Sequence, residues 1–385
     1  MDSLDTREWL LTNGLGSYAN GTISDAHTRI YHGWLVAARQ PPVQRRLLLA
    51  RIDASLDNGR QRYDLGTNYW EGGKISPTGY RLLQSFQRYP TPTWTWGGRD
   101  WSLTRRLLMP YAWHQQCASD AVAGNSCTIG RQRLLVQYRY QGDTTATLNL
   151  RPLIADRSLH YQQSAADDLR FSQIVGDRQV MLQAIRPQQA GTTWTLRWTD
   201  GSYYPEGVWY WNYHYPEETK RGLGDREDLY SPGYLVVSLE PGAGVTLEAS
   251  LDDGSAPLLS EHSFEDALDA EASRLRRYWQ QVQPLRQSTI PSQRSGFPTA
   301  ATKALSAAEA KLVDSSGSSN VTALQRLLQA GDQFVVYRQS VASPTLLAGY
   351  PWFGDWGRDA LIALPGLTLT TGRFELAKGM LQTFA

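Results

Sequence analysis

Short segments in which apolar and polar residues alternate dominate the chain from Glu8 to about Ser250. Every second residue is apolar in Leu134–Tyr140 and in Thr145–Leu150, which is the period of a strand with one buried face. Residues 141–143 separate these two segments and are predicted as a hairpin turn. The other predicted strands include Tyr31–Ala37, Arg46–Ile52, Trp101–Met109, Thr193–Thr199 and Tyr234–Leu239. Many short strands without helical patterns between them predict an antiparallel β-sandwich.

The hydrophobic period changes near Ser260. From Ser263, a candidate N-cap, apolar residues recur at intervals of three and four and predict an amphipathic helix of about 18 residues. Residues 283–297 are rich in Pro, Ser and Gln and predict a linker, and residues 315–319 predict a loop. Further helical patterns cover Thr299–Val313, Thr322–Tyr337 and Phe374–Phe384. We therefore expect a β domain over residues 1–258, a helical linker over 259–298, and the first helices of an all-α domain over 299–385.

The balance of charges and the lack of long apolar stretches indicate which binding partners are not expected. The 38 basic residues nearly balance the 37 acidic ones, without a run of like charge, so neither a nucleic acid nor an anionic membrane is an expected partner. The N-terminus lacks the apolar core of a signal peptide, and no stretch has the roughly 18 apolar residues of a membrane span. Cys117 and Cys127 either pair across a hairpin or stay as two reduced thiols. We expect a cytoplasmic protein.

The aromatic residues are mostly of the kind that carry a polar group. The chain has 14 Trp and 20 Tyr but 8 Phe. Such side chains suit a surface that is half apolar and half wet, as the C–H faces and hydroxyls of a sugar require. Packing in a β-rich core is the alternative explanation for many of them.

Residues 349–359 concentrate the candidate chemistry. Within these eleven residues lie two carboxylates, one arginine and four aromatic side chains, Tyr350, Trp352, Phe353 and Trp356. Pro351, Gly354 and Gly357 predict a shaped loop, which leads into a helix with Asp359 near its start. One interpretation is a sugar subsite, with an aromatic platform under the ring and Asp and Arg bonded to hydroxyls. The other is that the aromatics belong to a core and that Arg358 and Asp359 form a structural cap.

Three sequence blocks carry a resemblance to a known family. Tyr350-Pro-Trp-Phe-Gly-Asp-Trp-Gly-Arg-Asp359 and its continuation to Leu369 resemble the opening of the catalytic domain of bacterial and archaeal glycogen-debranching enzymes of the amylo-α-1,6-glucosidase type. Two upstream blocks resemble the N-terminal domain of that family: Glu8–Tyr18 followed by Thr28–Val36, and Arg221–Gly233. The blocks occur in the family's order, and the resemblance covers nearly the whole chain.

The resemblance implies both a fold and an activity. The fold is an N-terminal β-supersandwich, a helical linker and the beginning of an (α/α)6 toroid. The activity is hydrolysis of α-1,6-linked glucose stubs on glycogen or a related α-glucan, with inversion and without a cofactor. Inversion needs two carboxyl groups about 6.5–9.5 Å apart. By analogy with related toroid glucosidases, Arg358 and Asp359 hold the terminal glucose, together with Trp352, Asp355 and Trp356. Asp355 is also a candidate for orienting water.

The catalytic acid and base themselves have no expected positions in this chain. A twelve-helix toroid needs some 300 residues at roughly 1.5 Å rise per residue, more than those that follow Pro298. We expect the acid and base beyond Ala385, in a longer protein of which this chain is a fragment. Two alternatives are a non-catalytic glucan-binding fragment and a glucoamylase-like or phosphorylase toroid enzyme acting on related α-glucans.

Three further segments each allow a functional or a structural interpretation. His32 either touches a ligand or is a hydrogen-bonded structural histidine. Residues 13–17 are glycine-rich but match neither nucleotide-binding pattern, so a tight turn is expected. The aromatic cluster Trp209–Tyr215 is expected to be a loop that either binds glucan or packs between domains. No set of His, Cys, Asp and Glu has the spacing of metal ligands.

Overall fold

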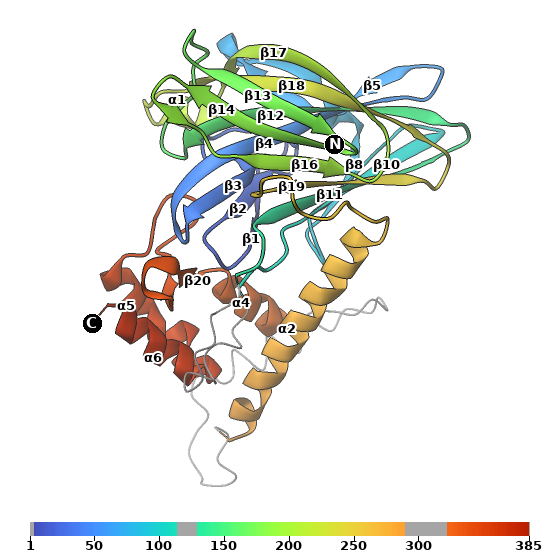
Figure 1. The fold of residues 1–385 in the computed structure, drawn as a ribbon. Coiled ribbons are helices and arrows are strands. Elements are labelled where there is room, and N and C mark those ends of the chain that lie inside the picture. Colours follow the sequence, from blue (N-terminus) through green and yellow to red (C-terminus); the bar gives the residue numbers. More distant parts are fainter. Residues whose placement is uncertain (1–3, 114–128, 289–321, 385) are drawn as a thin grey trace.

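The computed structural model describes residues 4–113, 129–288 and 322–384 (Figure 1). The two cysteines, the predicted helix Thr299–Val313 and the predicted loop at 315–319 lie outside the described residues. Among the described residues, no helix combines the length and the apolar character that crossing a membrane requires.

Two large antiparallel sheets make up the β region. Sheet A has the strand order β1-β2-β3-β4-β12-β18-β17-β6-β7, with β5 paired to β4. Its strands are β1 (Glu8–Thr12), β2 (Tyr18–Thr22), β3 (Gly33–Gln40), β4 (Val43–Asp57), β5 (Arg62–Asp64), β6 (Thr67–Trp70), β7 (Lys74–Thr78), β12 (Ala146–Ser158), β17 (Ser202–His214) and β18 (Arg226–Leu239). The predicted antiparallel β fold is confirmed over the described part of this region.

Sheet B has the order β13-β14-β16-β19-β11-β10-β9-β8, with β15 paired to β14. Its strands are β8 (Leu83–Gln87), β9 (Thr93–Gly97), β10 (Trp101–Leu108), β11 (Arg133–Gly142), β13 (Arg170–Gly176), β14 (Gln179–Arg186), β15 (Gln189–Ala190), β16 (Trp194–Trp198) and β19 (Gly244–Ser250). The two sheets enclose one hydrophobic core, to which both contribute.

Strand β11 continues to Gly142, and residues 143–145 connect it to β12 in the other sheet, so the predicted hairpin turn at 141–143 is wrong. β11 pairs with β10 and β19, whereas β12 pairs with β4 and β18. Leu134, Val136, Tyr138 and Tyr140 of β11 and Ala146, Leu148 and Leu150 of β12 are all buried in the shared core. The two strands therefore face the same core from opposite sheets. A period of two shows only that one face of each strand is buried, so it could not show whether the two strands pair with each other or lie in different sheets.

The first turns of helix α2 (Ser263–Ser288) pack against the outer face of sheet B. Phe264 and Ala267 pack there against Leu108 of β10 and Leu135 of β11. Burial of Phe264 alone contributes roughly 1.5–3 kcal/mol. The helix has 26 residues instead of the predicted length of about 18, and Ser263 is not its cap, since the N–H of Asp266 donates to the carbonyl of His262.

The C-terminal segment, residues 322–384, contains three α-helices and one β-hairpin. The helices are α4 (Ala323–Asp332), α5 (Gly357–Leu367) and α6 (Phe374–Thr383), and the hairpin strands are β20 (Val335–Arg338) and β21 (Ser343–Leu346). Thr322 and Gln325 form a capping box at the start of α4. The predicted helix Thr322–Tyr337 ends at Asp332. Val335 and Tyr337 lie in one hydrophobic core and Val336 lies in another, so successive side chains point to opposite faces, as they do in a strand.

The C-terminal segment attaches to the β region through shared cores. One core combines Tyr18 and Leu47 of sheet A with Val336, Leu347 and Tyr350. Figure 1 shows α4, α5 and α6 grouped at the opposite end of the molecule from β17. Because α4, α5 and α6 are the described helices that follow residue 322, the toroid stays a prediction.

Candidate functional site

A pocket of about 600 Å³ lies where the loop at 349–356 meets the β region. It is lined by Arg29, Tyr31, His160, Arg221, Trp352, Phe353, Gly354 and Trp356. This volume is in the range of small-molecule sites. Apart from His160, every lining residue comes from one of three segments, 28–36, 221–233 and 350–359, which are far apart in the sequence.

The first wall of the pocket is the loop at 28–32. Each backbone carbonyl from Thr28 to Tyr31 accepts a hydrogen bond. The Thr28 carbonyl accepts from the N–H of Glu217 at 3.0 Å, and that of Arg29 from His32 at 3.1 Å. The next two carbonyls accept from side chains: Arg157 Nη2 donates to Ile30 at 2.7 Å, and the Tyr18 hydroxyl donates to Tyr31 at 3.0 Å. A loop with its carbonyls satisfied in this way presents Arg29 and Tyr31 in a defined place.

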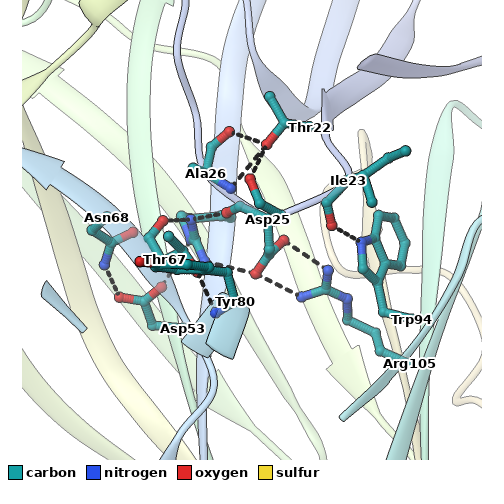
Figure 2. Close-up of polar contacts among 12 residues, drawn as sticks. Thr22, Ile23, Asp25, Ala26, Asp53, Thr67, Asn68, Tyr80, Trp94 and Arg105 are labelled. Carbon is teal, nitrogen blue, oxygen red and sulfur yellow. Dashed lines mark hydrogen bonds and ion pairs between the residues drawn. The ribbon is translucent and has the colours of Figure 1, made fainter. Parts of the chain in front are cut away.

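A buried charge cluster holds the chain just before this wall (Figure 2). Asp25 is 4% exposed and has a φ of 64°. Its carboxylate accepts from Arg51 Nη2 at 2.8 Å and from Arg105 Nη2 at 2.7 Å, as Figure 2 shows for Arg105. The Arg105 guanidinium also lies 4.4–4.7 Å from the ring centroids of Trp34, Trp94 and Trp96. Two arginines and one aspartate thus fix the turn that leads into the wall.

Arg29 is held by carboxylates of the same domain. Its Nε donates to Glu8 Oε1 at 2.7 Å, and its Nη2 lies 4.0 Å from Glu217 Oε2. The guanidinium lies over the Trp352 ring, 5.7 Å from its centroid, which is a cation–π contact. Glu8 also meets His32 Nε2 at 3.5 Å. Burial alone would raise the pKa of Glu8, but His32 and Arg29 outweigh it and lower the pKa to about 2.

This shift predicts an acid-sensitive step in stability. The folded-state pKa of Glu8 lies below its ordinary value of 4.5, so its contribution is complete above that pH and is lost as the pH falls toward about 2. Glu8→Gln should therefore lose less unfolding free energy than the parent chain between pH 5.5 and 3.5, measured by urea denaturation. Glu261→Gln, at an exposed position, is the matched control and should follow the parent. Equal losses in Glu8→Gln and the parent would contradict the assignment.

Arg221 reaches the pocket from the turn after α1 (Pro216–Lys220). Its Nη1 donates to Glu218 Oε2 at 3.1 Å, and the Glu218 side chain is fully buried. The Arg221 side chain itself is 45% exposed. A buried carboxylate therefore fixes a guanidinium whose other end remains open to the pocket and solvent.

Tyr31 and His160 form the neutral polar part of the lining. The Tyr31 hydroxyl lies 3.4 Å from His160 Nδ1. Burial and the charge of Glu218 raise the pKa of Tyr31, and partial burial and Arg45 lower the pKa of His160. At neutral pH the phenol keeps its proton and the imidazole is uncharged, so the pair can both donate and accept hydrogen bonds.

The second wall is aromatic. Trp352 packs edge-on against Tyr31 with ring centroids 6.1 Å apart, and Phe353 lies 5.3 Å from Trp356. The loop closes on itself through the N–H of Phe353, which donates to the Gly349 carbonyl at 2.9 Å. Arg45 of β4 secures it from below: its Nη2 donates to the Phe353 carbonyl at 2.5 Å.

The Arg45 guanidinium is 5% exposed and lies 5.8 Å from the ring centroids of both Tyr18 and Tyr350. Those two rings meet edge-on at 5.7 Å. A cation between two rings, with a carbonyl as its hydrogen-bond acceptor, joins the β region to the base of the aromatic loop.

The five residues that the sequence singled out divide into two groups. Trp352 and Trp356 line the pocket. Asp355 does not: its side chain is 3% exposed and is bonded to Arg338 of β20. Arg358 has a side chain that is 76% exposed, and its Nε lies 3.6 Å from Asp359 Oδ2 in the first turn of α5. The predicted helix after the loop is confirmed.

The sequence interpretation missed the lining residues Arg29, Tyr31, His160 and Arg221. The first two and Arg221 lie inside the upstream blocks, so family resemblance was the signal that could have found them. His160 follows β12 without any motif. His32, by contrast, is fully buried and accepts from the N–H of Thr28 at 3.1 Å, which confirms the structural interpretation.

Two other candidate segments have a defined local structure. Gly14 and Gly16 have φ values of 74° and 85°, and the N–H of Leu15 donates to Asn13 Oδ1, as expected of a tight turn. Residues 209–214 belong to strand β17, so the predicted aromatic loop is wrong. Within the described ranges, no group of three or more His, Cys, Asp or Glu side chains could hold a metal ion.

Comparison with known proteins identifies both parts of the chain. The family model for the glycogen debranching enzyme N terminal matches residues 7–246, which is more than half of the 385 residues. The model for amylo-α-1,6-glucosidase matches residues 329–385, so the chain includes the start of that domain. No curated protein matches the chain. With the three blocks meeting at one pocket and both models in order along the sequence, the chain belongs to the glycogen debranching enzyme family.

Proposed function

We propose that the pocket binds the glucose end of an α-glucan branch and that the protein acts as an amylo-α-1,6-glucosidase. The family implies an α-glucan as the substrate. Residues 329–385 open the glucosidase domain. The activity itself, removal of α-1,6-linked glucose stubs from glycogen, belongs to a polypeptide that carries the whole of that domain as an (α/α)6 toroid.

One observation carries this proposal: the pocket has an aromatic wall facing a polar one. Trp352 offers a ring face of the kind on which the C–H groups of a sugar stack. Arg29 lies over the same ring, at 5.7 Å from its centroid, and Tyr31 adds a phenol. A mostly apolar cleft with a few placed polar groups is typical of a small-molecule site.

The proposed reaction is inverting. One carboxylic acid protonates the leaving oxygen, and a carboxylate on the other face of the sugar activates water. Neither group is assigned to the described residues. Asp359 is proposed to bind a glucose hydroxyl beside the pocket, since its Oδ2 is buried and makes no hydrogen bond among the described residues. Asp355, bonded to Arg338, is proposed to shape the loop that carries both tryptophans.

The binding claim can be tested on the chain itself. Trp352→Ala should weaken the binding of maltotriose by about tenfold or more, because the stacking surface is lost. Isothermal titration calorimetry measures the affinity. Trp211→Ala is the matched control, since Trp211 is 57% exposed on β17 and does not line the pocket. Equal affinities for parent and Trp352→Ala would contradict the proposal.

The reaction itself is tested with a polypeptide that carries the complete glucosidase domain. It should release glucose from a maltooligosaccharide that carries one α-1,6-linked glucose stub, and much less from linear maltooligosaccharides. Release of glucose from the linear substrate alone would contradict debranching and favour a glucoamylase-like activity.

A further inference from the structure

We infer that the β region supplies the hydroxyl-binding half of the pocket, with Arg29 and Arg221 as the residues that bind the sugar. This inference rests on the proposed function, because it takes an α-glucan as the ligand. The sequence-based expectation assigned hydroxyl binding to Asp355, Arg358 and Asp359. The inference instead places most of the hydroxyl-binding groups on the β region, and Asp359 is the one contact still proposed from the C-terminal segment.

The C-terminal segment contributes almost no polar side chain to the pocket lining. Its lining residues are Trp352, Phe353, Gly354 and Trp356. Asp355 is occupied by Arg338 and is nearly inaccessible, and Arg358 extends into solvent outside the lining. Every charged or hydrogen-bonding lining side chain other than the two indole N–H groups therefore comes from residues 29–221.

Arg29 and Arg221 both have donors to spare. A guanidinium carries five N–H groups in a fixed fork that fits two adjacent oxygen atoms. Arg29 donates Nε–H to Glu8, and Arg221 donates from Nη1 to Glu218. These are the hydrogen bonds that the two guanidinium groups make among the described residues. The remaining N–H groups are available for the neighbouring hydroxyls of a glucose unit.

The anchoring carboxylates also make these arginines suited to a neutral ligand. Glu8 and Glu217 lie next to Arg29, and Glu218 lies next to Arg221, so each positive charge is balanced inside the protein. A site built for a phosphate group would leave such charges uncompensated. A guanidinium group whose charge is balanced and whose orientation is fixed can instead donate hydrogen bonds to a neutral polyol, and it loses little rotamer freedom when the ligand binds.

Substitution of each arginine tests the inference. Arg221→Gln and Arg29→Gln should each weaken maltotriose binding by about tenfold, because each removes charge-assisted hydrogen bonds to the sugar. Arg226→Gln is the matched control, since Arg226 is 56% exposed, pairs with Glu71 and does not line the pocket. Calorimetry gives the affinity, and thermal melting shows whether the variant is folded. Arg221, being the more exposed of the two, keeps the test valid if Arg29→Gln unfolds.

The outcomes separate this inference from the proposed function. If the parent binds maltotriose, Trp352→Ala loses binding and both arginine variants bind like the parent, then the inference is wrong and the proposed function stands. If the parent binds no maltotriose, both are wrong. Binding of inorganic phosphate that competes with maltotriose and is lost in Arg221→Gln would overturn the assignment of a neutral ligand.

Discussion

Replacement of Asp25 by alanine is expected to lower the free energy of unfolding by about 3–5 kcal/mol, because two buried guanidinium groups lose the carboxylate that they share. Among the described residues, the only ion pair that Arg51 keeps is the one with Asp53, at 2.8 Å. Arg51 and Arg105 are 0% and 2% exposed, so water cannot replace the lost carboxylate. Urea denaturation followed by tryptophan fluorescence measures the change. The effect should be the largest of those described, since the Asp25 turn also supports the loop that forms the first pocket wall.

The matched control is Asp100→Ala. Asp100 pairs with Arg60 at 3.3 Å, and both side chains are largely exposed. Such a pair contributes at most about 1 kcal/mol. Similar shifts of the urea midpoint in the two variants would contradict the role given to the buried cluster.

Replacement of Arg45 by methionine is the second expected large effect. The buried cation between Tyr18 and Tyr350 is lost, and the Phe353 carbonyl is left without its donor, at a cost of about 1–3 kcal/mol in stability. The aromatic loop then loses its attachment to β4. We expect maltotriose affinity to fall by about tenfold as well, although Arg45 is not among the pocket-lining residues.

Arg45 is thus a positioning residue, and the conservative variant distinguishes this role from simple stability. Arg45→Lys keeps a cation between the rings and a donor for the carbonyl, so it should recover much of the affinity. If Arg45→Met loses stability but binds maltotriose like the parent, then the loop does not depend on Arg45 for its binding position.

Local patterns predicted the elements of the fold better than their pairing. The alternation in β11 and β12 follows directly from burial of every second side chain, and the helix starting near Ser263 follows from its apolar stripe. The sheet to which a strand belongs is decided by contacts distant in the sequence. Residues 141–143 therefore looked like a hairpin turn, although β12 pairs with β4 and β18. The strand after α4 was missed because Val335–Tyr337 also fit a helical period.

The sequence predicted only part of the candidate site, because local patterns do not show which distant residues meet in the fold. Trp352 and Trp356 lie in one short, unusual segment, and a local pattern is enough to mark them. Arg29 and Arg221 meet Trp352 at the pocket through tertiary packing, and the only sequence signal that could have marked them was the family resemblance of the blocks that contain them. Asp355 looked available in the sequence, but its partner Arg338 lies on a strand that the helical prediction had removed.

The most direct test of the central claim is a crystal structure of the chain with a maltooligosaccharide that carries one α-1,6-linked glucose. The glucose stub should occupy the pocket, with its ring face against Trp352 and its hydroxyls within hydrogen-bond distance of Arg29 or Arg221. A sugar bound elsewhere on the protein, with this pocket left vacant, would contradict the claim.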